Sequence, residues 1–353
     1  MVARLRYAGG EPTLPALGQP DLVDAMRVIV LGGTRFIGRR IVADLVARGD
    51  EVLVVHRGQT EPDGLPAVQH LHVDRPAFAS IAAEVARFAP DAVIDCYAMS
   101  RSDVDSVLPH LPDTQLVLLS SMDVYQAFHY VVGGEGESEP VPVPEDGRLR
   151  AARYIYRGGA VRPDDYEKLD VDPSYLERGG TVLRLAMIYG EHDHQRREEF
   201  VLRRLRARRR LIPVGSGTWL WTRAYVGDVS AAVLACLDNA AVRGEVLNIG
   251  EPAVRSIRGW AADILATATQ ILGDDRTAEF VTVPDSHLPD DLWLTRSIDQ
   301  HILVDCGKAV RLLDWHPDPA AGLARSVAWH LEYPPDTTPE FTADDAALAA
   351  VQR

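Results

Sequence analysis

The sequence has little cysteine and no long apolar run. Its 353 residues include three cysteines, Cys96, Cys236 and Cys306, and no CxxC pair. This pattern disfavours a disulfide scaffold and a structural zinc site, and it predicts a reducing, cytoplasmic environment. No stretch reaches the roughly eighteen apolar residues that a membrane span requires, so we expect no membrane partner.

An excess of positive charge is also missing. The chain carries 37 Lys and Arg residues against 51 Asp and Glu residues, which gives a net charge of −14. Non-specific binding to nucleic acid depends on neutralising phosphates, so this balance makes a nucleic-acid partner unlikely. Hydrophobic residues at 46% and charged residues at 25% are typical of globular proteins and exclude a mostly disordered chain.

Strands and helices are predicted to alternate from Met26 onward. A β-branched strand at 27–31 runs into Gly32-Gly33, and apolar residues spaced four apart then predict a helix that ends at Gly49. Further strands are predicted at 51–55, 91–95, 116–119, 181–185, 245–249 and 279–283, with helices at 81–88, 104–108, 258–272 and 320–331. This order predicts an α/β protein with a Rossmann-type doubly wound parallel sheet.

The turn after the first strand has the pattern of a phosphate-binding loop. A glycine permits the tight turn, a later glycine lets the helix pack close to the strand, and the helix N-terminus offers free N–H groups to a pyrophosphate. The predicted cofactor-binding residues are therefore Gly32, Gly33, Thr34, Arg35, Phe36, Ile37 and Gly38.

The end of the second strand indicates which cofactor is bound. An Asp or Glu there usually holds a free ribose 2′-hydroxyl, but the chain has Val55-His56-Arg57-Gly58. Arg57 and Arg35 could pair with a 2′-phosphate, because guanidinium binds phosphate oxygens bidentately. We therefore predict NADP(H), with NAD(H) as the alternative if both arginines are simply solvated.

Several later segments complete a recognisable pattern. They are Asp74 after the third strand, Leu119-Ser-Ser-Met-Asp-Val-Tyr125, Leu185-Ala-Met-Ile-Tyr-Gly190, Thr222-Arg-Ala-Tyr-Val-Gly-Asp-Val229 and Asn248-Ile-Gly250. In this order the chain resembles the extended short-chain dehydrogenase/reductase family, the NAD(P)-dependent epimerase/dehydratase group. The GGTRFIG loop followed by His-Arg-Gly is most similar to the atypical branch that includes chloroplast stem-loop-binding relatives.

The resemblance implies a division of the chain into parts. Residues 26–190 would form the NADP-binding domain, with 220–250 returning to it, and 191–219 and 251–333 would form a smaller C-terminal α/β substrate domain. Residues 1–25 are predicted to be a flexible extension and 334–353 a mobile acidic tail. The stretch between about Gly133 and Pro163, rich in Pro, Gly and Glu, is predicted to be a functional loop.

Family chemistry uses a Ser or Thr, a Tyr acid/base and a Lys four residues after the Tyr. The resemblance assigns Ser121 to the substrate oxygen, although it could instead cap the strand end, and Lys168 to the nicotinamide ribose. Four residues before Lys168, however, stands Asp164. Tyr166 is only two residues away, which on a helix places the two side chains about 200° apart.

Two acid/base candidates follow from this departure. Tyr166 would serve if it lies in a non-helical entrance after Pro163, with Asp164 capping the helix. Asp123 would serve as a proton shuttle, because dehydratase members of the family carry acids just after the Ser or Thr; otherwise it hydrogen-bonds a loop. Both remain catalytic candidates with Ser121 and Lys168.

The substrate side is less specific. Tyr125, His192 and Arg223 are predicted to bind substrate, with Arg223 matching the family's pyrophosphate-binding arginine. His192-Asp-His194 lacks metal-ligand spacing, so no metal is predicted. The eight arginines of 196–210 are predicted to be mostly solvated. Trp219 and Trp221 lie two residues apart on a predicted strand and are predicted to pack in the core rather than to stack on bases.

The sequence thus predicts an NADP(H)-dependent oxidoreductase, epimerase or dehydratase. It would act by hydride transfer on a hydroxylated small molecule, an anionic nucleotide sugar being expected, and the resemblance implies a homodimer. The alternative is a cofactor-binding scaffold or RNA-associated protein that kept the fold and lost the family tyrosine.

Overall fold

The computed structural model describes residues 25–133, 136, 138–160, 162–273 and 277–351. Except for Ala25, the predicted N-terminal extension lies outside the described residues. None of the helices in the described part of the chain has the length and apolar character that crossing a membrane requires.

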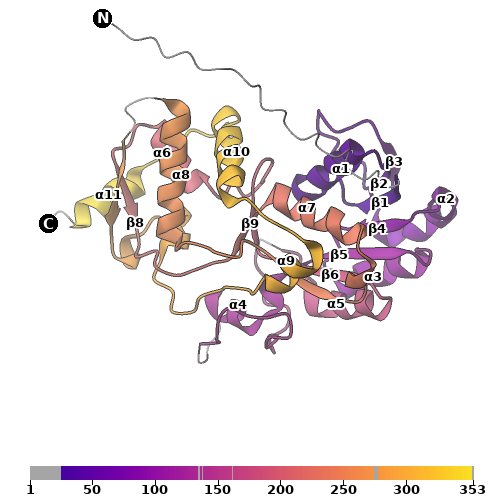
Figure 1. Ribbon diagram of the computed structural model, residues 1–353. Coiled ribbons are helices and arrows are strands. Elements are labelled where there is room, and N and C mark those ends of the chain that lie inside the picture. Colours follow the sequence, from indigo (N-terminus) through magenta and orange to yellow (C-terminus); the bar gives the residue numbers. More distant parts are fainter. Residues whose placement is uncertain (1–24, 134–135, 137, 161, 274–276, 352–353) are drawn as a thin grey trace, which may run out of the picture.

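Seven parallel strands form the main sheet in the order β10-β6-β5-β4-β1-β2-β3 (Figure 1). They are β1 (Arg27–Leu31), β2 (Glu51–His56), β3 (Gln69–His72), β4 (Ala92–Asp95), β5 (Gln115–Ser121), β6 (Thr181–Leu185) and β10 (Val246–Ile249). The order reverses between β1 and β4, and at such a switch point doubly wound sheets bind their ligands. The predicted Rossmann-type fold is confirmed.

Helices cover both faces of this sheet. Helices α1 (Phe36–Arg48) and α7 (Val226–Leu237) pack on each other along one face, and α3 (Arg101–Val107) and α5 (Lys168–Glu177) lie on the other. The predicted end of the first helix is confirmed, since Gly49 takes a left-handed φ of 99° and its N–H bonds Leu45 O. The shorter elements are η1 (Arg75–Ile81), α2 (Ala82–Phe88), η2 (Leu108–His110), η3 (Met122–Val124), α4 (Gln126–Val131), η4 (Ala240–Val242) and α9 (Gly307–Leu313).

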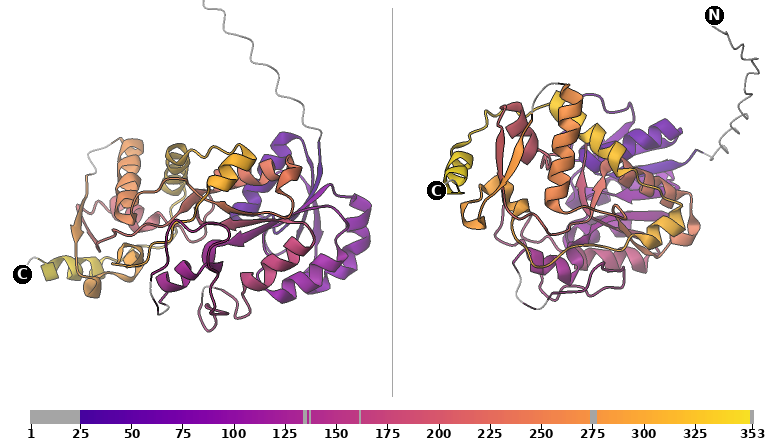
Figure 2. Two further views of the ribbon diagram at one scale, coloured as in Figure 1. Left: turned by 60° about the horizontal axis from the view of Figure 1, so that its bottom comes forward. Right: turned by 60° about the vertical axis from the view of Figure 1, so that its left-hand side comes forward.

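The C-terminal part lies beside the edge of the sheet at which the strands reach their carboxyl ends (Figures 1 and 2). Two small parallel pairs join β7 (Met187–Tyr189) to β9 (Arg223–Tyr225) and β8 (Leu211–Val214) to β11 (Glu279–Thr282). The helices around them are α6 (Glu199–Arg206), α8 (Ile257–Leu272), η5 (Asp285–His287), η6 (Asp290–Thr295), α10 (Pro319–Glu332) and α11 (Thr342–Val351). This is the predicted smaller α/β region.

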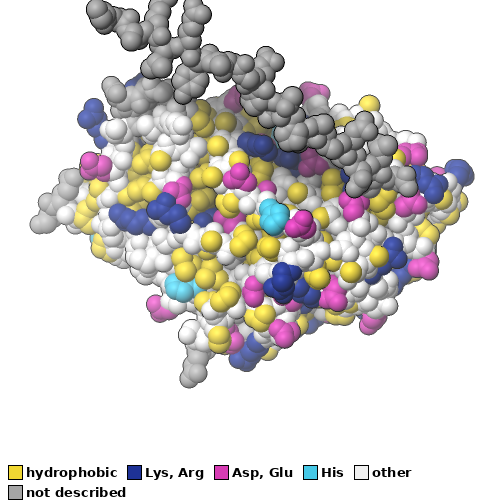
Figure 3. Space-filling model, in the orientation of Figure 1, with side chains coloured by type: hydrophobic (Ala, Val, Ile, Leu, Met, Phe, Trp, Pro, Cys, Tyr) yellow, Lys and Arg dark blue, Asp and Glu magenta, His cyan; other side chains and the backbone are white. Residues whose placement is uncertain are grey.

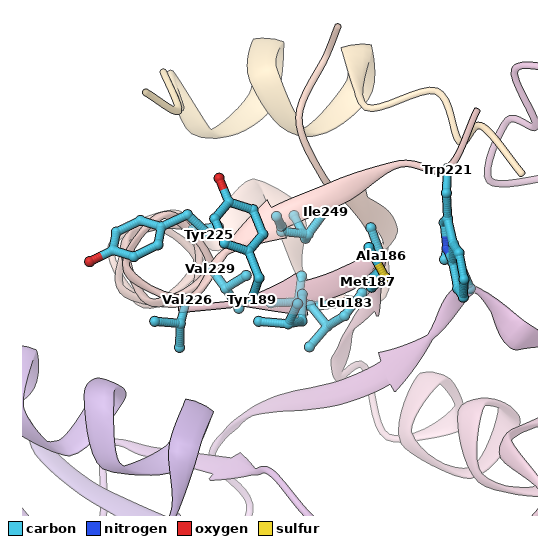
Figure 4. Packing of buried hydrophobic residues seen from close by; sticks show 14 of the residues in the cluster. Leu183, Ala186, Met187, Tyr189, Trp221, Tyr225, Val226, Val229 and Ile249 are labelled. Carbon is cyan, nitrogen blue, oxygen red and sulfur yellow. The ribbon is translucent and has the colours of Figure 1, made fainter. Parts of the chain in front are cut away.

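One apolar core joins the two parts. Figure 4 shows Leu183 and Ile249 of the main sheet in the same layer as Tyr189 and Val229, and all four belong to one buried cluster. Trp219 is fully buried in that cluster. Its packing role agrees with the sequence prediction, because its indole N–H bonds Leu294 O at 2.7 Å.

The C-terminal tail differs from its prediction. The structure places helix α11 where a mobile acidic tail was expected, because α11 carries Asp344 into a buried ion pair with Arg204 of α6. Two hydrogen bonds of 2.7 Å join these side chains, and a third of 2.7 Å runs from Arg204 to Asp291. The prediction that the eight arginines of this segment are mostly solvated is wrong, since Arg204 is buried and only Arg208 and Arg210 are exposed, while the other five are half-buried and paired with acidic side chains. The acidic tail is held by charge as well as by packing.

The Arg204–Asp344 pair generates a stability prediction. Asp344→Ala leaves the guanidinium of Arg204 buried with only part of its charge compensated, so we expect the free energy of unfolding to fall by about 3–5 kcal/mol. Asp105→Ala, which breaks an exposed pair on α3, is the matched control and should cost less than about 1 kcal/mol. Urea unfolding followed by circular dichroism measures both, and equal small effects would contradict the packed tail.

Candidate functional site

The turn between β1 and α1 has the geometry of a phosphate cradle. Gly32 has a φ of 88°, which suits glycine, and its N–H donates to Val55 O at 3.0 Å. A Cβ on Gly38 would lie 2.2 Å from the carbonyl oxygen of Gly32, so only glycine allows the helix to approach this closely. Arg35 precedes the helix without a side-chain capping bond, which leaves the first N–H groups of α1 available to a ligand.

A cavity of about 350 Å³ opens beside this turn, at the carboxyl ends of β1 and β2. Five predicted cofactor residues line it: Gly32, Thr34, Arg35, Arg57 and Asp74. The other predicted loop residues, Gly33, Phe36, Ile37 and Gly38, do not line it. The cavity is large enough to accept the adenosine end of a dinucleotide.

The charged groups around this cavity are paired with one another. Arg57 Nε lies 3.8 Å from Asp74 Oδ1, and both side chains are exposed. Arg75 lies deeper and donates two hydrogen bonds, of 3.0 and 2.7 Å, to Asp95 at the end of β4. Arg75 lines the cavity but was missed from the sequence, because the contact joins a 3-10 turn to a strand twenty residues later. Arg57 is exposed and more loosely paired than Arg75, and exposed Arg35 lines the same cavity.

The segment before Lys168 shows how Tyr166 can contribute although it lies only two residues from that lysine. Helix α5 begins at Lys168, and its cap is Glu167, whose carboxylate accepts the Leu169 N–H at 3.1 Å. The prediction that Asp164 caps the helix is wrong, since its side chain instead accepts the Gly158 N–H at 2.8 Å. Tyr166 lies outside the helix, and the 200° argument against it no longer applies.

Tyr166 and Asp123 meet in the interior. The Tyr166 hydroxyl donates to Asp123 Oδ2 at 2.7 Å, and the Tyr156 hydroxyl donates to the same oxygen at 3.3 Å. The other oxygen, Asp123 Oδ1, is buried without a hydrogen-bond partner among the described residues. An unpaired buried carboxylate oxygen is costly unless a ligand satisfies it. The two acid/base candidates therefore form one unit.

The Pro, Gly and Glu-rich stretch completes this unit. It supplies Tyr156, whose ring packs edge-on against Tyr166 with centroids 5.3 Å apart. It also supplies the buried Arg150, which donates to the Asp123 carbonyl at 2.8 Å and to the Glu167 carboxylate at 2.9 Å. Sequence reasoning marked this loop but neither residue, because nothing local indicates which loop side chain reaches the sheet.

Lys168 is buried beside the ends of β4 and β5. Its ammonium donates to Ala98 O at 2.6 Å and to Leu119 O at 3.0 Å. Burial lowers the pKa of Lys168, against the opposing charges of Asp172 and Asp123. Burial, together with Asp123, raises the pKa of Tyr166. The opposing charge of Arg162, which lowers the pKa of Tyr166, is outweighed by burial and the carboxylate.

Ser121 ends β5 and caps the turn that follows. Its hydroxyl accepts the Asp123 N–H at 3.2 Å, and its side chain is half-buried. This is the capping role that the sequence left open beside the catalytic one. Since a hydroxyl that accepts one bond can still donate another, the cap does not prevent contact with a substrate oxygen.

The predicted substrate residues lie apart from one another. Tyr125 is fully buried, and its hydroxyl is bonded to Asn248 at 2.7 Å and to Arg184 at 3.1 Å. Arg223 is buried against Trp260, with its guanidinium carbon 5.0 Å from the ring centroid. His192 is exposed and packs edge-on against Trp329 with ring centroids 4.8 Å apart. The structure brings none of the three together.

A larger cavity, of about 990 Å³, lies between α6 and the C-terminal segment. Arginine and aromatic side chains share its lining, with Arg196, Arg197, Arg203, Arg206, Trp221, Trp293 and Phe341 among them. Trp221 also packs on Phe128 of α4, the helix that follows Asp123, with ring centroids 6.2 Å apart. Tyr125, His192 and Arg223 do not line this cavity.

Comparison with known proteins agrees with this geometry. The sequence matches the NAD dependent epimerase/dehydratase family over residues 28–111 and 171–250. It is 26% identical over 350 residues to the chloroplast stem-loop binding protein of 41 kDa b of Arabidopsis thaliana, covering 92% of this chain and 84% of that protein.

Solved structures share the fold. The UDP-glucose-4-epimerase of Stenotrophomonas maltophila with bound NAD has a TM-score of 0.64 at 18% identity, with 87% of this chain and 98% of that chain covered. The dTDP-glucose 4,6-dehydratase of Bacillus anthracis in complex with NAD has a TM-score of 0.61 at 17% identity, with 88% and 98% covered. Residues 28–111 and 171–250 thus match the NAD dependent epimerase/dehydratase family, and the fold is shared with solved epimerase and dehydratase structures.

Proposed function

We propose that this chain is an NADP(H)-dependent enzyme that oxidises, reduces, epimerises or dehydrates a hydroxylated small molecule, with Asp123 and Tyr166 acting together as its acid/base. One observation carries the proposal: Tyr166 donates a 2.7 Å hydrogen bond to Asp123 Oδ2, while Asp123 Oδ1 stays buried and unpaired among the described residues. A substrate hydroxyl would supply the missing partner.

The cofactor site fits a nicotinamide dinucleotide. When bound, the nicotinamide ring supplies hydride transfer. The amides at the start of α1 bind the pyrophosphate, and the contact of Gly38 with Gly32 keeps them within reach. Arg57 and Arg35, both exposed and both lining the cavity, bind the 2′-phosphate. This charge is our reason for preferring NADP(H) to NAD(H).

The surroundings of Tyr166 and Asp123 decide which of them donates and which accepts a proton. Burial and the neighbouring carboxylate raise the pKa of Tyr166, which keeps its hydroxyl protonated and a donor at neutral pH. Asp123 is the acceptor, since Oδ1 takes the substrate proton while Tyr166 and Tyr156 stabilise the negative charge on Oδ2. Ser121, two residues before Asp123, orients the substrate oxygen.

Lys168 has a positioning role. Two of its three N–H donors are fixed on Ala98 O and Leu119 O, and the third remains for a ribose hydroxyl of the cofactor. The Ala98 carbonyl follows β4, which adjoins the switch point of the sheet, and the Leu119 carbonyl lies near the end of β5. This arrangement binds the sugar without requiring the lysine to activate Tyr166.

The substrate is proposed to be an anionic nucleotide sugar. The larger cavity places arginines, which bind phosphate, beside tryptophan and phenylalanine rings, which can stack on a base. The structure with 18% identity holds a formylated UDP-arabinopyranose, and the dehydratase acts on dTDP-glucose by name. The three free cysteines support a cytoplasmic location. The family resemblance supports a homodimer.

A second candidate is an RNA-associated protein or cofactor-binding scaffold. The relative from Arabidopsis thaliana is a stem-loop binding protein, and Asp164 stands where the family tyrosine is expected. One observation argues against an RNA-binding surface: on the face drawn in Figure 3, basic side chains are interspersed with acidic ones. The unpaired Asp123 oxygen also has no role in a scaffold. We therefore favour the enzyme.

Arg57 tests the cofactor preference. Arg57→Leu removes a charge-assisted hydrogen bond to a 2′-phosphate, so the dissociation constant of NADP(H) should rise about 10- to 100-fold while that of NAD(H) changes less than about two-fold. Isothermal titration calorimetry measures the dissociation constants of NADP(H) and NAD(H) for both the unmodified chain and the variant. Arg101→Leu, an exposed arginine of α3, is the control and should change neither. Equal affinity of the unmodified chain for both cofactors would contradict the preference.

Asp123 tests the chemistry. Asp123→Asn keeps the shape but removes the base, and kcat should fall about 10²- to 10⁴-fold with NADP(H) affinity retained. Tyr166→Phe removes one bond to the carboxylate and should lower kcat about 10- to 100-fold. Turnover is measured by absorbance at 340 nm and by product stereochemistry over a panel of UDP- and dTDP-sugars.

Tyr333→Phe, an exposed tyrosine of the C-terminal segment, is the matched control and should retain full turnover. If the unmodified chain binds cofactor, turns over no member of the panel and retains RNA in a salt-sensitive manner, the second candidate replaces the enzyme. If Asp123→Asn turns over as fast as the unmodified chain, the assignment of the base is wrong.

A further inference from the structure

Three histidines gather at the β2–β3 edge of the sheet. His56 ends β2 and is paired in register with His72 of β3, and His70 precedes it by two residues on the same face of β3. The Glu61 side chain, from the loop between the two strands, lies against this face. We refer to these four residues as the histidine cluster. It lies outside the acid/base unit, and no role above uses it.

The ligand atoms of the cluster lie close together. His56 Nε2 is 2.9 Å from His70 Nδ1 and 3.4 Å from Glu61 Oε1, and His72 Nε2 is 2.5 Å from the same carboxylate oxygen. All four atoms lie within 4.8 Å of one another. In a tetrahedral site with bonds of about 2.0–2.2 Å, neighbouring ligand atoms are about 3.3–3.6 Å apart. A small movement of each side chain would produce this arrangement.

The donor set indicates the class of metal. Three imidazole nitrogens and one carboxylate oxygen suit a borderline ion such as Zn²⁺ and disfavour Mg²⁺ and Ca²⁺, which prefer oxygen ligands. Metal binding requires neutral imidazole. Burial and the two neighbouring rings lower the pKa of His56, which favours that form. The ring gives up the hydrogen bond that its Nδ1 accepts from Gly58 N–H, because that nitrogen must then carry the proton.

We propose that His56, Glu61, His70 and His72 bind one Zn²⁺ ion. The site joins two strands and their connecting loop, and the same loop contacts the phosphate turn, with Thr60 Oγ1 3.4 Å from Thr34 Oγ1. Arg39 of α1 also holds this loop through the Asp63 carbonyl at 2.9 Å. The bound ion fixes the loop that carries Arg57 at the rim of the cofactor cavity.

Metal binding is tested on the full, untagged chain. After chelator treatment and dialysis against Zn²⁺, elemental analysis should find one zinc per chain, and an excess of Mg²⁺ should not displace it. His70→Ala and His72→Ala should each weaken the zinc affinity, measured by competition with a chromogenic chelator, by at least about 10-fold. His316→Ala, an exposed histidine elsewhere, is the control and should bind zinc as the unmodified chain does.

A spectroscopic measurement covers the case in which a variant fails to fold. Co²⁺ added to the unmodified chain should give the strong visible bands of a tetrahedral site, and added Zn²⁺ should abolish them. Weak octahedral bands, fewer than one zinc per chain, or unchanged affinity in folded His70→Ala and His72→Ala would each overturn the proposal. These readouts need neither NADP(H) nor turnover, so they fail or succeed independently of the proposed enzyme.

Discussion

The close approach of Gly38 to the Gly32 carbonyl is the constraint on which the cofactor site depends. The gap leaves no room for a Cβ, so only glycine lets the start of α1 lie this close to the turn after β1. The cavity beside the turn and the arginines around it follow from this placement. A larger residue at position 38 would move the helix and with it the phosphate cradle.

The late start of α5 has an equally direct chemical consequence. With Glu167 as the cap, Tyr166 is released from the helix and reaches Asp123, 43 residues earlier in the chain. Lys168, the first helical residue, donates instead to the backbone carbonyls of Ala98, after β4, and Leu119 of β5. In the proposed mechanism, proton transfer is therefore assigned to Asp123 and Tyr166, and cofactor binding to Lys168.

The strand, turn and helix around Gly32 were predictable because their signals are local. The sequence made Asp123 and Tyr166 candidates for the acid/base but did not predict their contact, since local periodicity says nothing about which loop meets which strand end. The histidine cluster was missed for the same reason: it exists only through the register of β2 with β3. Helix α11 was missed because charged residues suggest solvent, whereas Asp344 is buried by its pairing with Arg204.

A crystal structure of the complex with NADP⁺ and a bound nucleotide sugar tests the central claim most directly. The account predicts that the pyrophosphate lies on the first amides of α1 and that Asp123 Oδ1 accepts a hydrogen bond of about 2.6–3.2 Å from the reacting hydroxyl, beside nicotinamide C4. A nicotinamide ring that lies away from Asp123, or a reacting hydroxyl that contacts only other groups, would contradict it.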